Sequence, residues 1–404
     1  MKVLFTFGGL PHYLVAQLNK LNEQENIEVV VIVPSSKSKT IGDGVKQSDE
    51  GIHFRVIYLN EKNTFYKKPF FENFSETIRL EKPEIIVTMW PYILAFVLYP
   101  SISKLIKKTK TKLILKEIPF MVAPFQNTLK YYKEHPIYNE DLEYEKTSGI
   151  KFFLNHTILA YIRKSYYRKI NATVNYTDEA YRIIGSYGVK KEQIFVGYNS
   201  PDTEEIFNIK NSIINKPAML SNNPHRLIHV GRLVKWKRVD LIINAVHNLK
   251  NKFPSIELII IGTGNQEKNL KELVSKLSLE NNIKFIGGVY DLKILGKYLL
   301  ESSIYILGGM GGLSLNEAMC FGKPIICSVC DGTEKKLVTQ NQNGLFFEEN
   351  NLEDLIKQID YLLSNPSIIE QMGRNSELFI KEKVNINTVM DAYMKAFQYV
   401  TTHS

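Results

Sequence analysis

Short apolar segments alternate with segments of helical periodicity along most of this chain. In the first half, runs of apolar and β-branched residues predict strands at residues 2–7, 27–33, 54–59, 85–89, 113–115 and 172–176. In the second half, similar runs predict strands at residues 227–230, 257–261, 284–286, 304–307, 325–327 and 345–347. Helical patterns lie between many of them, the clearest at residues 238–250, 267–277, 292–299 and 313–321. Short strands that alternate with helices are typical of a parallel sheet covered on both faces.

Two such series predict an α/β protein with two doubly wound, Rossmann-like domains. The expected join lies near Asn199-Ser200-Pro201-Asp202 or in the polar segment 208–224. We therefore expect domains at residues 1–200 and 201–385, and a last helix at residues 386–404 that could pack back on the first domain. Ligands of parallel sheets bind beyond the carboxyl ends of the strands, so the expected site is the cleft between the two domains.

The composition is that of a folded protein, and the length of the chain suits the two predicted domains. Of the 404 residues, 44% are hydrophobic and 23% are charged, which excludes a disordered, collagen-like or coiled-coil chain. The three cysteines (Cys320, Cys327 and Cys330) cannot form a disulfide framework, so a reducing cytoplasm is the expected location. Cys327-Ser328-Val329-Cys330 has no second pair and no nearby histidine, which favours buried thiols over a zinc site.

The positive charge is concentrated in the first half. Residues 1–200 hold 28 Lys and Arg against 20 Asp and Glu, a net +8, whereas residues 201–404 hold 23 against 22, a net +1. This asymmetry favours a polyanion or an anionic membrane surface facing the first half, or it reflects a Lys-rich composition without a function. Residues 85–103 carry no charge, but Pro91 and Pro100 interrupt them, which favours a strand, a turn and a helix over a membrane span.

Two stretches of the first half combine cations with aromatic or apolar neighbours. Residues 152–170 are aromatic and basic and are expected to form a helix, and residues 101–116, with six lysines, are expected to form a loop after an apolar helix. Either stretch could dock on an anionic leaflet, and the second is the better candidate. Nucleic acid is not an expected partner, because no groove-reading helix or stacking platform is present.

A glycine-rich turn follows the predicted strand at residues 304–307. Gly308-Gly309-Met310-Gly311-Gly312 leads into the predicted helix that starts at Leu313. Glycines let backbone N–H groups approach an anion closely, and the first turn of a helix leaves N–H groups unpaired. The pattern predicts a phosphate-binding turn, and the alternative is a tightly packed turn without a ligand.

A basic segment follows the first predicted strand of the second domain. Arg232, Lys235, Lys237 and Arg238 fall within seven residues directly after it. A guanidinium suits forked binding of phosphate oxygens, and an ammonium suits a point-charge contact. The segment predicts a diphosphate contact, although a solvated basic loop has the same composition.

Taken together, these segments resemble the family 4 glycosyltransferases, which have the GT-B fold. The resemblance covers most of the chain in order. It rests on Gly8-Gly9, on Asn199-Ser200-Pro201-Asp202-Thr203 through Phe207, on Gly231-Arg232 with Lys237, on Gly262-Thr263-Gly264, and on Glu317-Ala318-Met319 with Gly322 and Pro324.

The resemblance implies a role for each matching residue. Arg232 and Lys237 would hold the donor diphosphate, Glu317 would contact the donor ribose, and Val289 would lie near the base. On the acceptor side, His12 and Glu117 are weaker candidates. The other donor-binding residues that it implies are Gly8, Gly9, Gly262, Gly264, Gly309, Gly311, Gly312, Leu313 and Ser314.

The implied activity is transfer of a hexose, with retention, from a UDP- or GDP-linked sugar. The acceptor would be a glycan or a lipid-linked oligosaccharide in the synthesis of lipopolysaccharide O-antigen, capsule or exopolysaccharide. Family members need no bound metal and no further cofactor, and this sequence contains no D-x-D pair. The protein would then be cytoplasmic and could sit on the inner face of the plasma membrane.

The sequence departs from the family at two places. The family has two glutamates spaced E-x₇-E, and Gly309 stands where the first is expected, eight residues before Glu317. The family's H-D pair near the fifth first-domain strand is replaced by Lys116-Glu117. Two alternatives therefore stay open: a nucleotide-sugar epimerase of the same architecture, and a catalytically silent GT-B partner subunit.

Overall fold

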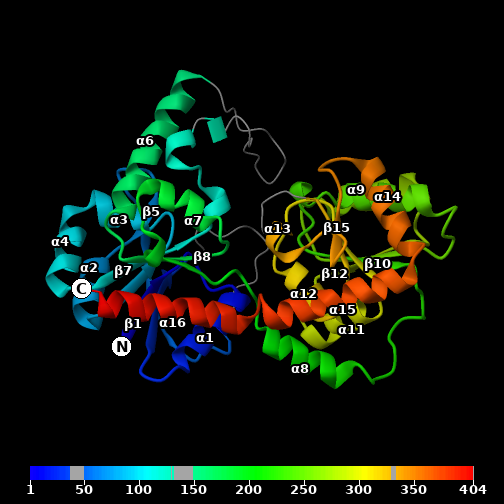
Figure 1. Cartoon of the computed structure of the whole chain (residues 1–404), viewed down its shortest axis with the longest axis horizontal. Coiled ribbons are helices and arrows are strands. Elements are labelled where there is room, and N and C mark those ends of the chain that lie inside the picture. Colours follow the sequence, from blue (N-terminus) through cyan, green and yellow to red (C-terminus); the bar gives the residue numbers. More distant parts are fainter. Residues whose placement is uncertain (37–49, 129, 132–148, 329–333, 404) are drawn as a thin grey trace. The chain divides into compact units, whose positions relative to one another are not determined.

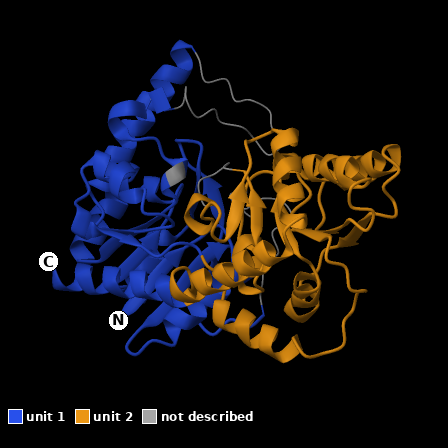
Figure 2. Cartoon of the chain, turned by 45° about the vertical axis from the view of Figure 1, so that its right-hand side comes forward, with its two compact units in different colours: residues 1–137, 146–199, 387–404 blue, residues 138–145, 200–386 orange. Residues whose placement is uncertain are grey.

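The computed structural model describes residues 1–36, 50–128, 130–131, 149–328 and 334–403. Contacts divide this part of the chain into two compact units (Figure 2). Unit 1 holds the described residues up to Asn199 together with residues 387–403, and unit 2 holds those from Ser200 to Ile386. Each unit is described by itself.

Unit 1 is built on a seven-stranded parallel sheet with the strand order β3-β2-β1-β6-β7-β8-β9 (Figure 1). Its strands are β1 (Lys2–Thr6), β2 (Glu28–Pro34), β3 (Arg55–Leu59), β6 (Ile85–Thr88), β7 (Lys112–Glu117), β8 (Ala172–Asn175) and β9 (Ile194–Val196). A small antiparallel pair consists of β4 (Glu61–Asn63) and β5 (Pro69–Phe71). The helices are α1 (His12–Asn22), α2 (Phe74–Glu81), α3 (Ile93–Leu98), α4 (Pro100–Thr109), α6 (Ile150–Tyr167), α7 (Ala180–Ile183) and α16 (Ile386–Thr402).

Helices cover both faces of this sheet. Leu4 and its neighbours on one face share a buried core with Phe74 of α2, Phe96 of α3 and Tyr166 of α6. On the other face, the Phe5 ring packs edge-on against Tyr393 of α16, with ring centroids 5.9 Å apart. Side chains alternate between faces along a strand, which explains why the fully apolar strands of this sheet are buried on both sides.

Unit 2 is built on a six-stranded parallel sheet with the strand order β12-β11-β10-β13-β14-β15. Its strands are β10 (Arg226–Val230), β11 (Glu257–Ile261), β12 (Ile283–Gly287), β13 (Ile304–Leu307), β14 (Ile325–Cys327) and β15 (Gly344–Phe346). Its helices are α8 (Thr203–Ile213), α9 (Val239–Leu249), α10 (Glu267–Lys276), α11 (Leu292–Leu300), α12 (Ser314–Cys320), α13 (Glu334–Leu337), α14 (Leu352–Leu363) and α15 (Pro366–Glu382). The two doubly wound sheets predicted from the sequence are thus confirmed.

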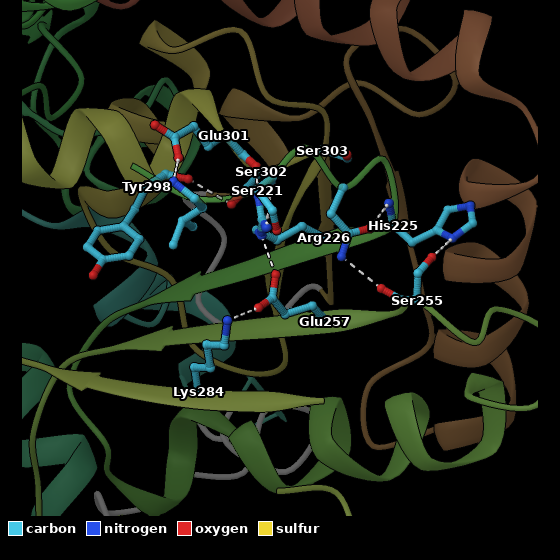
Figure 3. Close-up of polar contacts among 12 residues, drawn as sticks. Ser221, His225, Arg226, Ser255, Glu257, Lys284, Tyr298, Glu301, Ser302 and Ser303 are labelled. Carbon is cyan, nitrogen blue, oxygen red and sulfur yellow. Dashed lines mark hydrogen bonds and ion pairs between the residues drawn. The ribbon is translucent and has the colours of Figure 1, made fainter. Parts of the chain in front are cut away.

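A buried polar network fixes the start of β10, at the sheet edge opposite the candidate site described below (Figure 3). Arg226 is 1% exposed and forms an ion pair with Glu257 of the neighbouring strand. Its remaining donors bind the carbonyl oxygens of Glu301 (2.7 Å) and Ser221 (2.8 Å). Lys284 binds the other Glu257 oxygen at 2.5 Å. Although burial opposes it, these hydrogen bonds hold the pKa of Glu257 below its ordinary value.

Two expectations about local structure were wrong. Residues 208–213 were expected in a linker, but they belong to α8, because Ile206 and Ile213 form a buried face and Lys210 binds Glu377 (2.7 Å). Residues 101–109 were expected in a loop, but they form α4, which starts at Pro100 and buries Ile102 and Leu105. Polar and charged residues occupy most positions of both helices, so the few apolar positions that face the core do not stand out in the sequence.

The uncharged segment 85–103 forms β6, α3 and the start of α4. Among the described residues, no helix is both long enough and apolar enough to cross a membrane.

Candidate functional site

The candidate site lies at the carboxyl edge of the second sheet. From β10 the chain winds to β11 on one side, and it later returns to β13 on the other side of β10. The turns after β10 and β13 therefore lie side by side where the winding reverses. This is the position at which doubly wound sheets bind their ligands.

Backbone hydrogen bonds tie three turns together at this edge. The N–H of Leu233 donates to the carbonyl of Thr263 in the turn after β11, and the N–H of Gln266 donates back to Leu233, both at 2.9 Å. On the other side, the N–H of Met310 donates to the carbonyl of Trp236 at 3.1 Å. The structure thus brings the basic segment, the Gly262–Gly264 turn and the glycine-rich turn into one surface.

Lys237 joins two of these turns through its side chain. It ends the short helix η5 (Lys235–Lys237) and is 8% exposed. Its Nζ donates to the carbonyl oxygens of Met310 and Gly311, each at 2.6 Å. A buried ammonium is therefore fixed against the glycine-rich turn, where an anion would meet its charge.

The other cations of the basic segment have different surroundings. Arg238 is held by Asp240 (Nη2 to Oδ2, 3.0 Å) and by Asn350, so it fixes the start of α9. Lys235 is exposed, and Arg232 is half-buried directly after β10. Arg232 is therefore the arginine of this segment that stands at the sheet edge.

The glycine-rich turn needs its glycines to different degrees. A Cβ at Gly309 would lie 2.0 Å from the carbonyl oxygen of Trp236, and a Cβ at Gly311 would lie 2.5 Å from a Glu334 carboxylate oxygen. Among the described residues, a Cβ at Gly312 would meet nothing closer than the Lys237 Nζ at 3.6 Å. The departure at Gly309 thus has a steric reason, because no side chain, glutamate included, fits there unless the turn moves.

Glu317 lies in the first turn of α12 and is half-buried. Burial raises the pKa of its carboxyl group to about 7. No hydrogen bond or ion pair to this carboxylate occurs among the residues that the structure describes. A partly ionised carboxylate at this edge can accept hydrogen bonds from hydroxyl groups of a ligand.

Tyr305 was not singled out from the sequence. Its buried hydroxyl bonds the carbonyl of Val230 at the end of β10 (3.0 Å) and the hydroxyl of Ser314 at the start of α12 (2.7 Å). It therefore fixes the two elements that flank the candidate site. The available signal was a lone hydroxyl within the apolar strand Ile304–Leu307, since a buried hydroxyl needs a partner.

His229 belongs to the core of unit 2. Its Nδ1 lies 3.0 Å from the carbonyl of Ile306, and the ring is fully buried. Burial lowers the pKa of this imidazole to about 4, so it is neutral at pH 7.

The remaining predicted residues of unit 2 lie on the same surface or beside it. Gly262 has a φ of +139°, and a Cβ at Gly264 would lie 2.3 Å from the carbonyl oxygen of Leu233. Val289 is half-buried just after β12, at the outer end of the sheet. Leu313 and Ser314 form the junction between the glycine-rich turn and α12.

The four predicted residues of unit 1 are not equivalent. Gly8 and Gly9 are half-buried directly after β1, and His12 is exposed at the start of α1. Glu117 is buried, and its carboxylate accepts a hydrogen bond from the Tyr167 hydroxyl at 2.8 Å. Burial raises the pKa of Glu117, and its bond to α6 gives it a structural role inside the unit.

Cys320 and Cys327 are buried free thiols, and Cys330 lies outside the described residues.

In sequence and in fold, this chain is similar to known glycosyltransferases. Residues 210–379 match the family model "Glycosyl transferases group 1". An uncharacterised glycosyltransferase of Haemophilus influenzae is 35% identical over 182 residues, which is 44% of this chain and 50% of that protein. An uncharacterised glycosyltransferase of Methanocaldococcus jannaschii is 28% identical over 97% of this chain and 95% of its own length. The chain thus spans half the length of the first relative and nearly all of the second.

A third relative has a named acceptor. The poly(ribitol-phosphate) α-N-acetylglucosaminyltransferase of Staphylococcus aureus is 25% identical over 49% of this chain and 41% of that protein.

Among solved structures, HepE of Anabaena in complex with UDP has a TM-score of 0.66 to this chain. It is 15% identical and is covered over its whole length, with 98% of this chain included. This likeness shows the two-domain GT-B fold.

Proposed function

The chain belongs to the group 1 glycosyltransferases, and we propose that it transfers a hexose from a nucleotide diphosphate sugar to an acceptor used in cell-surface polysaccharide synthesis. The acceptor would be a glycan or a lipid-linked oligosaccharide, with unit 2 binding the donor and unit 1 the acceptor. The observation that carries the donor assignment is Lys237, a buried ammonium fixed between two turns at the reversal point of the sheet.

The proposed chemistry follows from the charge of the leaving group. The bond between the anomeric carbon and the diphosphate oxygen breaks, and the acceptor hydroxyl forms the new bond to carbon and loses its proton. Negative charge then builds up on the departing diphosphate. In this proposal, Arg232, Lys237 and the N–H groups of the glycine-rich turn stabilise that charge. Preorganised groups of this kind are usually the largest single contribution to lowering such a barrier.

The other proposed contacts concern the nucleoside. Glu317 would accept hydrogen bonds from the ribose hydroxyls, and Val289 would contact the base beside β12. The solved structure with UDP supports a uridine nucleotide as the first donor to test. Retention would follow from attack on the face that the diphosphate leaves.

A membrane-bound acceptor is supported by the surface of unit 1. On α6, Ile150, Phe153, Leu154, Ile158 and Tyr161 are 52–81% exposed. Their spacing places them along one side of the helix, whose upper end in Figure 1 lies beyond the other labelled helices of the unit. The apolar side of α6 can therefore enter the interfacial region of a leaflet.

Basic residues lie near the other end of the same helix. Lys104, Lys107 and Lys108 are exposed on α4. Burial and the nearby charge of Lys107 lower the pKa of Lys169, just beyond α6, so the two cations are neighbours. Each cation near an anionic leaflet contributes about 1 kcal/mol of attraction.

Ligand-dependent thermal unfolding tests the proposed donor. We expect UDP or UDP-glucose to raise the unfolding temperature of the full chain, with GDP and GDP-mannose as the matched purine series. A ligand at 100 times its Kd adds about 2.7 kcal/mol of stability, which is readily measured. A chain that responds to none of these ligands would point to the silent partner subunit, which the departure at Gly309 keeps as the second candidate. Rearrangement of the donor sugar without any acceptor would instead identify an epimerase.

A further inference from the structure

Lys116 is a buried cation that the proposed donor chemistry does not use. It lies on β7, one residue before the strand ends, and is 6% exposed. Its Nζ lies 5.5 Å from the ring centroid of Phe7, 5.4 Å from that of Tyr176 and 5.9 Å from that of Tyr393. Successive residues of a strand point to opposite faces, so Lys116 lies on the α16 face while Glu117 lies on the α6 face.

Three aromatic rings of the described residues lie around the charge of Lys116. Within the described part of the chain, no carboxylate or carbonyl oxygen forms a hydrogen bond or ion pair with its Nζ. Burial lowers the pKa of this ammonium to about 8, so most of it is still charged at pH 7. Buried lysines are ordinarily paired with an anion, and a methionine would fill the same apolar space without the cost of desolvation.

Lys116 lies at the carboxyl end of β7, where ligand-binding residues of parallel sheets are found. Phe7 directly precedes Gly8-Gly9, the turn after β1, and Tyr176 directly follows β8. Lys116 and its rings therefore stand at the carboxyl edge of the first sheet, where parallel sheets bind ligands. Aromatic walls around a cation exclude water and strengthen its attraction for an anion.

We infer that Lys116 binds an oxyanion, a phosphate or a carboxylate, that is part of the acceptor. This inference rests on the proposed function, in which unit 1 receives the acceptor. It identifies the acceptor as an anionic molecule and gives a reason for a lysine at the end of β7.

Calorimetric titration of the full chain tests the inference. Glycerol 3-phosphate and glucuronate are the two anionic probes, and glucose is the neutral one, all added with unit 2 saturated by UDP so that its diphosphate site is filled. We expect at least one anionic probe to bind about tenfold or more tightly than glucose. Preference for glycerol 3-phosphate would identify a phosphorylated acceptor, and preference for glucuronate would identify a uronic acid.

Three variants identify the residue responsible. Lys116→Met keeps the length and apolar contacts of the side chain and should lose that preference. Lys116→Arg keeps the charge and should retain part of it. Lys68→Met removes an exposed lysine of the same unit that has no proposed role, and it should bind as the unchanged chain does. Unfolding temperatures of the variants show that each is folded.

Equal binding of the anion by Lys116→Met and the unchanged chain, or equal binding of anions and glucose, would overturn the inference. UDP binding is measured on the same samples. If UDP binds and the anionic probes do not, only this inference fails; if UDP does not bind, the proposed function fails independently of Lys116.

Discussion

Residues two positions apart in the basic segment have very different surroundings. Lys235 is exposed to solvent, whereas Lys237 is buried with its ammonium on two carbonyl oxygens of the glycine-rich turn. The sequence pattern G-R…K identified Arg232 and Lys237, but it could not tell their environments from those of Lys235 and Arg238. The difference comes from the contacts that three turns make with one another.

These surroundings predict the effect of removing each cation. Arg232→Ala and Lys237→Ala should each lower the rate of transfer about 10²–10³-fold, which is the usual effect of losing one preorganised stabilising group. Lys235→Ala should leave the rate unchanged, because its side chain is exposed. The measurement is kcat/KM for the donor, with unfolding temperatures as the folding control. Near-normal turnover in either of the first two variants would refute the assignment of that residue to the leaving group.

Glu317 predicts a dependence of stability on pH. Burial raises its pKa to about 7, so between the ordinary glutamate value of 4.5 and pH 7 the folded chain holds a proton that the unfolded chain has released. The contribution of this group to stability therefore falls as the pH rises through that window. Glu317→Gln removes the titration, so its unfolding temperature relative to the unchanged chain should be higher at pH 8 than at pH 5. A difference that is the same at both values would contradict the raised pKa.

Single residues also mark where sequence patterns are insufficient. Tyr305 and Lys116 each interrupt an apolar strand, and neither matches a motif. Their roles depend on partners from distant parts of the chain, such as Ser314 for Tyr305 and Tyr393 for Lys116. The order of strands and helices in the fold brings these partners close. That order cannot be read from the sequence of one strand.

At the scale of elements, strands were easier to predict than the segments between them. The central strands of both sheets are buried on both faces, so their apolar runs are continuous and stand out from the polar neighbours. Amphipathic α8 and α4 were missed because only a few positions of each face the core. The short pair of β4 and β5 gives no clear period of two and was also missed.

The glycine-rich turn allows a matched pair of substitutions. Gly309→Ala places a methyl group 2.0 Å from the Trp236 carbonyl oxygen, whereas the described neighbour that Gly312→Ala would meet first lies 3.6 Å away. We expect Gly309→Ala to lower the unfolding temperature and to weaken donor binding, because the turns after β10 and β13 must separate. Gly312→Ala should remain as stable as the unchanged chain. Equal unfolding temperatures for the two variants would show that the close packing of the turns does not matter.

At the scale of the whole molecule, charge and exposed apolar surface coincide in one unit. Residues 1–200 carry the net +8, and the exposed side of α6 lies within them. The charge asymmetry was evident in the sequence, but the exposed side of α6 was not, since its apolar residues look the same whether they are buried or exposed.

This coincidence predicts binding to anionic membranes. The chain should float with vesicles of phosphatidylcholine and phosphatidylglycerol, and less so at high salt, which screens the lysines. The variant with both Phe153→Ser and Ile158→Ser should float less. Leu378→Ser, which removes a residue of unit 2 that is 53% exposed, is the matched control. If the chain does not float with anionic vesicles, the membrane-bound acceptor loses its support.

The central claim is that the turns after β10 and β13 bind one diphosphate together. Hydrogen exchange with and without saturating UDP tests it most directly, because it reads each turn separately in the unaltered chain. We predict slower exchange in residues 231–238 and also in residues 309–317, with no change in α4 (Pro100–Thr109). Protection of only one of the two turns, or of neither, would contradict the account.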